Sequence, residues 1–197
     1  HAATLGAGND SVNFGGNLTA ADTLKGGAGQ DVIATTASNW GAMSALGAAL
    51  SAVSEFETLQ VVDDATSHVV VDAGLVGASH ARLAGQTGAE LVTVNNLGGT
   101  AHLANVRFDS GVAGVTLNLR DATLPSTADV VNLDVRGTAQ TYAFTLNGVE
   151  TLNVDASNAG TSVALALTDP ALTGLKVANT GLASFDAGML GANVGVV

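Results

Sequence analysis

Two aspartates, Asp10 and Asp31, each end a glycine-rich stretch and directly precede a short apolar run. The two stretches share one order of residue types, and their aspartates are 21 positions apart. Glycines at alternate positions allow a backbone with φ > 0, which lets carbonyl oxygens converge on one point. A carboxylate at the end of such a turn adds an anionic oxygen, and all-oxygen ligation suits Ca²⁺. The spacing therefore predicts stacked calcium-binding turns.

The second stretch, residues 26–34, fits the nonapeptide G-G-x-G-x-D-x-U-x of parallel β-rolls at every defined position, whereas the first has Leu5 in place of the first glycine. Residues 15–24 form a degenerate third copy that ends near Asp22. Turns two repeats apart share one edge of such a roll, so we expect Asp22 on the opposite edge from the other two aspartates. The predicted ligands, through carboxylates or backbone oxygens, are Leu5, Ala7, Gly8, Asn9, Asp10, Asp22, Gly26, Gly27, Gly29 and Asp31.

At these residues the chain resembles the RTX family of secreted calcium-binding proteins. The resemblance covers about the first 34 positions. An ordinary surface loop is the alternative for any single glycine-rich match, but two copies flanking a third favour the repeat. We expect this calcium-turn region to occupy residues 1–36, with strands near Ser11–Phe14 and Asp31–Ala34.

A helix is expected to follow, in residues 37–53. Trp40, Met43, Leu46, Leu50 and Val53 recur at helical spacing, with alanines between them. A serine or an asparagine, at position 38 or 39, can cap its start. We expect the apolar side of this helix to cover an end or a flank of a β core.

From residue 54 to residue 197 the pattern changes to short strands of alternating polarity. The last apolar residues of alternate strands are 19 to 27 positions apart, and the two interleaved series lengthen and shorten together. A solenoid in which each coil gives one strand to each of two sheets produces this pattern. The expected strands are Thr58–Val61, His68–Val71, Ala81–Leu83, Leu91–Val94, Val106–Phe108, Val115–Leu119, Val130–Val135, Tyr142–Leu146, Thr151–Val154, Val163–Leu167, Leu175–Val177 and Ala183–Phe185.

The predicted fold class is therefore mainly β: a right-handed parallel β-solenoid or β-roll of about six two-strand coils after residue 54, with one helix near the N-terminus. An immunoglobulin-like sandwich is the alternative, because it too has short strands every 8–12 residues. Few hairpin signals occur, Asn147-Gly148 being the exception, and this favours the solenoid over a meander.

Composition excludes several classes of function. The 197 residues carry 17 acidic and 6 basic side chains, a formal charge of −11, so the basic surface that nucleic acid requires is missing. There is no cysteine, hence no disulfide, and no apolar run reaches the roughly 18 residues needed to cross a bilayer. No signal peptide is visible and the chain opens on His1 without Met, so we interpret it as a piece of a larger protein.

A second internal repeat lies within the strand region. Residues 53–61 and 146–154 share the order apolar, Glu, Thr, Leu, amide, Val, and residues 88–94 are a looser copy. Such E-T-L-N-V repeats beside RTX nonapeptides, in an acidic chain rich in Ala, Thr, Val and Asn, resemble the S-layer proteins of Caulobacter and related surface proteins exported by type I secretion. This second resemblance extends over nearly the whole chain.

No catalytic arrangement is present in the sequence, and we expect the protein not to be an enzyme. The histidines, His1, His68, His80 and His102, form no H-E-x-x-H pair, and no serine lies in a G-x-S-x-G turn. Aspartates that end strands are usually turn formers. Of these, Asp129, Asp134 and Asp155 are the preferred further candidates for calcium, because asparagines or other acids lie close by.

The resemblance implies a structural segment of a secreted S-layer protein at the extracellular cell surface, folded and assembled with Ca²⁺. The expected partners are copies of itself in a surface lattice and a cell-surface polysaccharide, with no nucleic acid and no membrane insertion. An adhesin or ligand-binding module of a large RTX protein is the first alternative. The non-catalytic β-roll of a secreted hydrolase is the second.

Overall fold

The structure is a computed structural model, and it describes residues 1–47, 50, 52–63, 67–84, 91–98, 103–109, 114–120, 128–136, 141–156, 163–169, 171–178, 182–186 and 195–196. Within these residues one α-helix, one 3-10 turn and a series of short strands follow one another. The helical elements are α1 (Ala37–Ala45) and η2 (Ala73–Leu75). The strands are β1 (Ala2–Ala7), β2 (Ser11–Asn13), β3 (Thr23–Ala28), β4 (Val32–Thr35), β5 (Val53–Ser54), β6 (Thr58–Val61), β7 (Val69–Asp72), β8 (His80–Leu83), β9 (Leu91–Leu97), β10 (Leu103–Phe108), β11 (Gly114–Leu119), β12 (Val130–Val135), β13 (Thr141–Asn147), β14 (Thr151–Asp155), β15 (Val163–Thr168), β16 (Gly174–Ala178), β17 (Leu182–Asp186) and β18 (Gly195–Val196).

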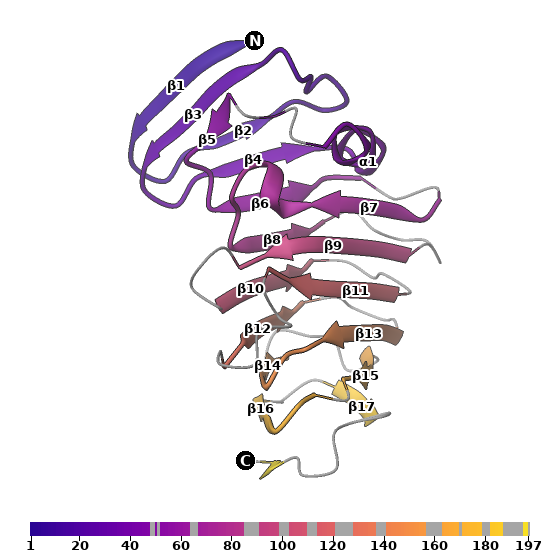
Figure 1. The fold of residues 1–197 in the computed structure, drawn as a ribbon. Helices are drawn as coiled ribbons and strands as arrows, with labels where there is room; N and C mark the ends of the chain where they lie inside the picture. The colour runs from indigo at the N-terminus through magenta and orange to yellow at the C-terminus, as the bar shows by residue number, and fades with distance from the viewer. Residues whose placement is uncertain are drawn as a thin grey trace.

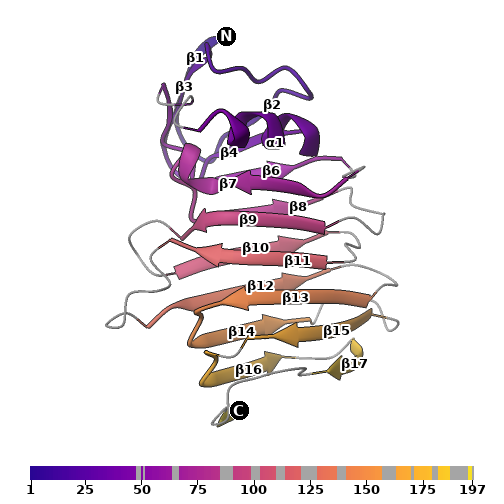
Figure 2. The same cartoon turned by 45° about the vertical axis from the view of Figure 1, so that its right-hand side comes forward.

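The strands form parallel sheets in which sequence neighbours alternate between sheets. The even-numbered strands from β2 to β18 make a nine-stranded sheet, and the odd-numbered strands from β7 to β17 make a six-stranded sheet. Near the N-terminus β1, β3 and β5 form a separate three-stranded sheet. Each coil therefore adds one strand to each side, and the coils stack in chain order from the N-terminus to the C-terminus (Figures 1 and 2).

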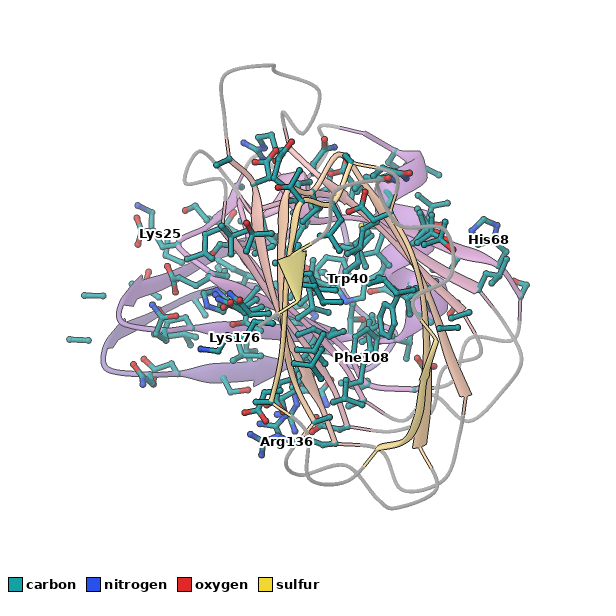
Figure 3. All side chains as sticks on the ribbon, turned by 90° about the horizontal axis from the view of Figure 1, so that it is seen from below. Lys25, Trp40, His68, Phe108, Arg136 and Lys176 are labelled. Carbon is teal, nitrogen blue, oxygen red and sulfur yellow. The ribbon has the colours of Figure 1, made fainter. Side chains whose placement is uncertain are left out.

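Alternation along each strand separates the core from the surface. In β12 and β6 every second residue is buried and the residues between are half-buried, as a strand with one covered face requires. The buried set is mostly aliphatic, and its largest members are Trp40, Phe56, Phe108 and Phe144. Trp40 and Phe108 lie between the two large sheets (Figure 3), and the indole of Trp40 donates to the carbonyl of Gln60 at 2.9 Å.

The parallel pairing confirms the fold class expected from the sequence, a mainly β parallel solenoid of about six turns with one helix. A sandwich of the immunoglobulin type requires antiparallel sheets and is therefore wrong. Each strand predicted after residue 54 overlaps an observed one. The strands β1, β3, β5 and β18 were not predicted; β1 and β3 contain the glycines of the nonapeptides, which indicated turns.

The helix is shorter than predicted. It begins after Thr36, whose side chain accepts a hydrogen bond from the backbone N–H of Asn39, and it ends at Ala45. Gly47 has φ +69, a left-handed conformation that stops a helix. Leu50 is buried outside the helix, and Val53 belongs to β5. The helical spacing of apolar residues in the sequence therefore extends beyond the last residue of the helix, and the predicted end at residue 53 is wrong.

Helix α1 packs on β7, the first strand of the six-stranded sheet (Figure 1). The hydroxyl of Ser44 accepts a hydrogen bond from the backbone N–H of Asp72 at 2.8 Å, and Gly41 lies close to Val69. An uncovered edge strand leaves backbone groups unpaired, so the helix protects this edge. Of the described helices, none has the length and apolarity to cross a membrane.

Replacing Phe108 by alanine should lower the free energy of unfolding by about 3–5 kcal/mol, because it removes a fully buried ring. That ring meets Phe144 edge-on at 4.8 Å between centroids. Urea unfolding followed by circular dichroism measures the change. Leu103→Ala on the same strand is the control and should cost under about 1 kcal/mol, because Leu103 is 38% exposed. Equal losses in both variants would contradict this description of the core.

Candidate calcium site

The two glycine-rich turns lie directly over one another at the N-terminal end of the solenoid. Strands β1 and β3 pair in parallel register, with Gly6 opposite Gly27, and β2 and β4 pair with Ser11 opposite Val32. The glycines have left-handed backbones: φ is +113 at Gly6, +125 at Gly8, +107 at Gly27 and +148 at Gly29. The structure therefore brings Asp10 and Asp31 onto one edge in successive coils, as the sequence predicted.

Backbone and side-chain hydrogen bonds join the two turns. The N–H of Gly8 donates to the carbonyl of Ala28 at 2.8 Å, and the N–H of Gln30 donates to Asn9 Oδ1 at 2.9 Å. The N–H of Asp10 donates to Asp31 Oδ1, also at 2.8 Å. One oxygen of the Asp31 carboxylate and the side-chain oxygen of Asn9 thus serve to hold the coils in register.

Close approach of the coils explains the glycines. A Cβ at Gly27 would lie 1.9 Å from the Gly6 carbonyl oxygen, and a Cβ at Gly29 would lie 2.0 Å from that of Gly8. A Cβ at Gly26 would lie 1.8 Å from the Glu55 carbonyl oxygen and 2.8 Å from Asp31 Oδ2. Only glycine permits this stacking, which brings a carbonyl oxygen of a neighbouring coil close to the backbone at each of these three positions.

Two carboxylate oxygens of these stacked turns lack a hydrogen-bond partner. Asp10 Oδ2 and Asp31 Oδ2 are buried, and no donor reaches either atom. The Asp31 side chain is fully buried. A buried carboxylate oxygen without a partner is costly, and a hard cation bound between two such oxygens removes this cost. The residues present therefore fit Ca²⁺, with carboxylates from successive coils.

The side chains alone do not complete a metal site. Within the described part of the chain no three His, Cys, Asp or Glu residues gather into a metal-binding group. A Ca²⁺ ion takes six to eight oxygens, so backbone carbonyls would have to supply most of them. The predicted positions Leu5 and Ala7 lie in β1, where Leu5 packs against the core and can offer only its carbonyl.

Asp22 lies apart from Asp10 and Asp31. It precedes β3, whereas Asp31 precedes β4 in another sheet, and its buried carboxylate pairs with the N-terminal ammonium of His1 and accepts from the N–H of Thr19. Burial alone would raise the pKa of Asp22, but these hydrogen bonds hold it below the usual value. The Asp22 carboxylate therefore belongs to another part of the first coils than the carboxylates of Asp10 and Asp31, as expected from the sequence, and its role as a ligand stays a prediction.

Sequence reasoning missed the role of Glu57. Its Oε2 accepts the backbone N–H of Asp31 at 2.8 Å, and its own carbonyl accepts the N–H groups of Ser79 and His80 in the next coil. Glu57 therefore links the coil before it to the coil after it. The available signal was the E-T-L repeat, which indicated an internal repeat and formed part of the S-layer resemblance, with no contact assigned to its glutamate.

The second copy of that repeat makes the same contacts. Glu150 Oε2 accepts the backbone N–H of Asp129 at 2.8 Å, and the Glu150 carbonyl accepts the N–H groups of Thr173 and Gly174. Asp129 is fully buried. The glutamate of the repeat is thus a link between three successive coils, and this explains why residues 53–61 and 146–154 are alike.

Near Glu150 lies another buried acid, Asp169, just after β15. One of its oxygens accepts the N–H of Ala171 at 2.9 Å, and Oδ2 has no partner. Burial, aided by the negative charge of Glu150 and opposed by backbone N–H donors, raises the pKa of Asp169 to about 6. Of the other candidates, Asp134 pairs with Arg136 at 2.8 Å, and His102 lies outside the described residues.

Comparison with known proteins gives no family for this chain. No family model matches it, and neither curated proteins nor solved structures give a match. Its function must therefore be argued from its own residues.

Gly27→Ala should destabilise the protein by more than about 2 kcal/mol, because a side chain there both meets the Gly6 carbonyl and requires φ +107. Chemical unfolding of the variant gives the change in free energy. Gly16→Ala is the matched control and should stay within about 1 kcal/mol of wild type, because its Cβ would meet nothing nearer than Thr36 Oγ1 at 3.8 Å. A harmless Gly27→Ala would show that the coils do not stack as described.

Asp169 should make stability depend on pH. Because its folded pKa of about 6 lies above the reference 3.8, protonated Asp169 favours folding at low pH, and this contribution is lost as the pH rises through about 6. We expect the stability advantage of Asp169→Asn over wild type to grow by about 3 kcal/mol between about pH 4 and pH 7.5. Urea unfolding at constant calcium across this range measures it. A difference that does not vary with pH would contradict the raised pKa.

Proposed function

We propose that this chain is a calcium-stabilised structural segment whose N-terminal coils bind Ca²⁺ between Asp10 and Asp31. The observation that carries the proposal is the pair of buried, partnerless carboxylate oxygens in stacked glycine turns. The carboxylates would supply the anionic ligands, and backbone carbonyls of the glycine-rich stretches would supply neutral ones. A bound ion would add oxygen coordination and positive charge to coils that are otherwise held by hydrogen bonds and apolar packing.

Such a site couples folding to calcium. Without the ion, the Asp10 and Asp31 carboxylates lie in successive coils and repel, so the first coils are held together weakly. With the ion, binding to the folded form stabilises it by mass action, about 2.7 kcal/mol when free Ca²⁺ is a hundred times its dissociation constant. Calcium is scarce in cytoplasm and abundant outside cells, so this coupling would keep the segment secretable and then fix its fold after export.

The setting we propose is a secreted S-layer protein exported by a type I system. This part of the proposal depends on the resemblance of residues 26–34 to RTX nonapeptides and on the acidic, cysteine-free composition. In that setting copies of the chain would assemble into a lattice. A ligand-binding or adhesin module is the second candidate, favoured by the groove on the nine-stranded sheet that is described below.

Calcium titration of wild type against two aspartate variants tests the proposal. We expect calcium to raise the thermal midpoint of wild type by several degrees, and Asp31→Asn to abolish most of that increase. Asp134→Asn is the matched control, because it removes the same charge from a residue paired with Arg136 far along the chain, and it should keep the full increase. Chelator should reverse the effect.

A thermal midpoint that is indifferent to calcium in wild type would contradict the calcium site. Equal losses in Asp31→Asn and Asp134→Asn would show that general charge screening, and not a site, causes the effect. Light scattering in the same titration separates the two settings: growth of ordered assemblies with calcium supports the lattice, and a monomer at every calcium concentration supports the ligand-binding module.

A further inference from the structure

A groove of about 710 Å³ runs over the outer face of the nine-stranded sheet, from Val32 in β4 to Ala178 in β16. Lys176 lies on this face, on the opposite side of the sheet from Trp40 and Phe108 (Figure 3). The N-terminal strands that carry Lys25 project beyond the same face (Figure 3). The groove thus crosses several coils and is separate from the candidate calcium site.

A continuous relay of side-chain hydrogen bonds forms one half of the groove floor. Asn153 donates to Asn132 at 2.8 Å, Asn132 donates to Asn105 at 2.9 Å, and Asn105 Nδ2 lies 2.9 Å from His80 Nε2. Because the amide nitrogen is the donor, His80 Nε2 accepts, and its Nδ1–H then donates to the Ser79 hydroxyl at 2.8 Å. Each amide keeps one N–H and one lone pair for a ligand, in an orientation fixed by its neighbours.

Charged side chains form the other half. The groove is lined by Arg82, Arg107 and Lys176 and by Asp134 and Asp155. With Arg136 and Asp109, which pair with these residues, four cations meet three acids, a formal charge of +1 in a chain of −11. Four of the chain's six basic residues lie on this face, since Arg136 pairs with Asp134 at the rim. Asp109 lies between Arg82 and Arg107 and pairs with both.

That shared acid, Asp109, orients the two guanidinium groups. It pairs with Arg82 and, at 2.6 Å, with Arg107. Burial tends to raise the pKa of Asp109, but the two arginines hold it below its usual value. Each guanidinium has five N–H donors, so donors remain for a ligand after this pairing. The arginines are therefore fixed and only partly satisfied, which is the condition for binding a carboxylate in a bidentate manner.

The shape and chemistry of the groove favour an extended sugar chain. Adjacent parallel strands are about 4.8 Å apart, so the relay repeats its donor and acceptor at a spacing close to one pyranose unit of an extended glycan. The hydroxyl groups of a sugar chain can form hydrogen bonds with the asparagine amides and with the two aspartates. Its acidic groups can pair with the basic side chains that are in excess on this face. No Trp, Tyr or Phe is among the described lining residues, so recognition would use charge and hydrogen bonds instead of stacking.

We propose that this groove binds an extended acidic polysaccharide, with uronate carboxylates on Arg82, Arg107 and Lys176 and sugar hydroxyls on the asparagine relay. This inference goes beyond the calcium site. It uses other residues, so it can fail while the calcium site stands.

Isothermal titration of the whole chain in one calcium-containing buffer tests the proposal with a hyaluronan octasaccharide and with the same octasaccharide after reduction of its carboxylates to alcohols. We expect binding of the acidic form, at least about tenfold weaker binding of the reduced form, and weakening by added salt. Arg107→Gln and Asn132→Ala should each weaken binding of the acidic form about tenfold. Arg120→Gln removes the same charge beside the six-stranded sheet and should change it less than about twofold.

Circular dichroism checks the fold of each variant, and Lys176→Gln, at an exposed position, gives a second charge change with little risk to folding. Three results would overturn the proposal: no measurable binding of the acidic octasaccharide, equal binding of the acidic and reduced forms, or equal weakening by Arg107→Gln and Arg120→Gln. Concentration-dependent self-association that Arg107→Gln abolishes, without glycan binding, would assign the face to contacts between copies and would also overturn it.

Discussion

Parallel stacking of coils is the constraint on which the rest of this structure depends. It places equivalent side chains of successive coils in columns, about 4.8 Å apart. Two like charges at roughly that separation repel by about 3 kcal/mol at an effective dielectric constant of 20. A chain with a formal charge of −11 must therefore give every acidic column a compensating partner. The column that contains Asp10 and Asp31 has two buried oxygens without one, and this is the physical reason for assigning a cation to it.

Several other columns meet the same constraint with protein groups. Along the nine-stranded sheet, asparagines in successive coils donate to one another, so a polar column carries no net charge. The stacked arginines Arg82 and Arg107 share Asp109. The glutamates of the two E-T-L repeats accept a backbone N–H from the preceding coil and offer a carbonyl to the next. Each arrangement joins the coils and also avoids or compensates like charges in one column. The same residues therefore determine both the stability and the surface chemistry of the protein.

Much of the fold could be predicted from the sequence because a solenoid repeats its pattern. Alternating apolar residues located the strands after residue 54, and the shared rhythm of the two strand series indicated parallel coils. The helix end was missed because Leu50 and Val53 kept the helical period after Gly47 had ended the helix. The aspartates of the candidate site were predicted from the glycine-rich motif and the spacing of its copies. The roles of Glu57 and Glu150 and the existence of the groove were not predicted. Their hydrogen bonds join residues 21 to 27 positions apart in coils of unequal length, and no fixed spacing in the sequence marks them.

The central claim is that a cation satisfies the two buried carboxylate oxygens between the first coils. A crystal structure of the chain grown with calcium, with anomalous scattering data, tests it most directly. The account predicts an anomalous peak bound by Asp10 Oδ2, Asp31 Oδ2 and backbone carbonyls of the glycine-rich turns, at oxygen distances of about 2.3–2.6 Å. Density without an ion, with these oxygens bound to water or to a lysine, would contradict it.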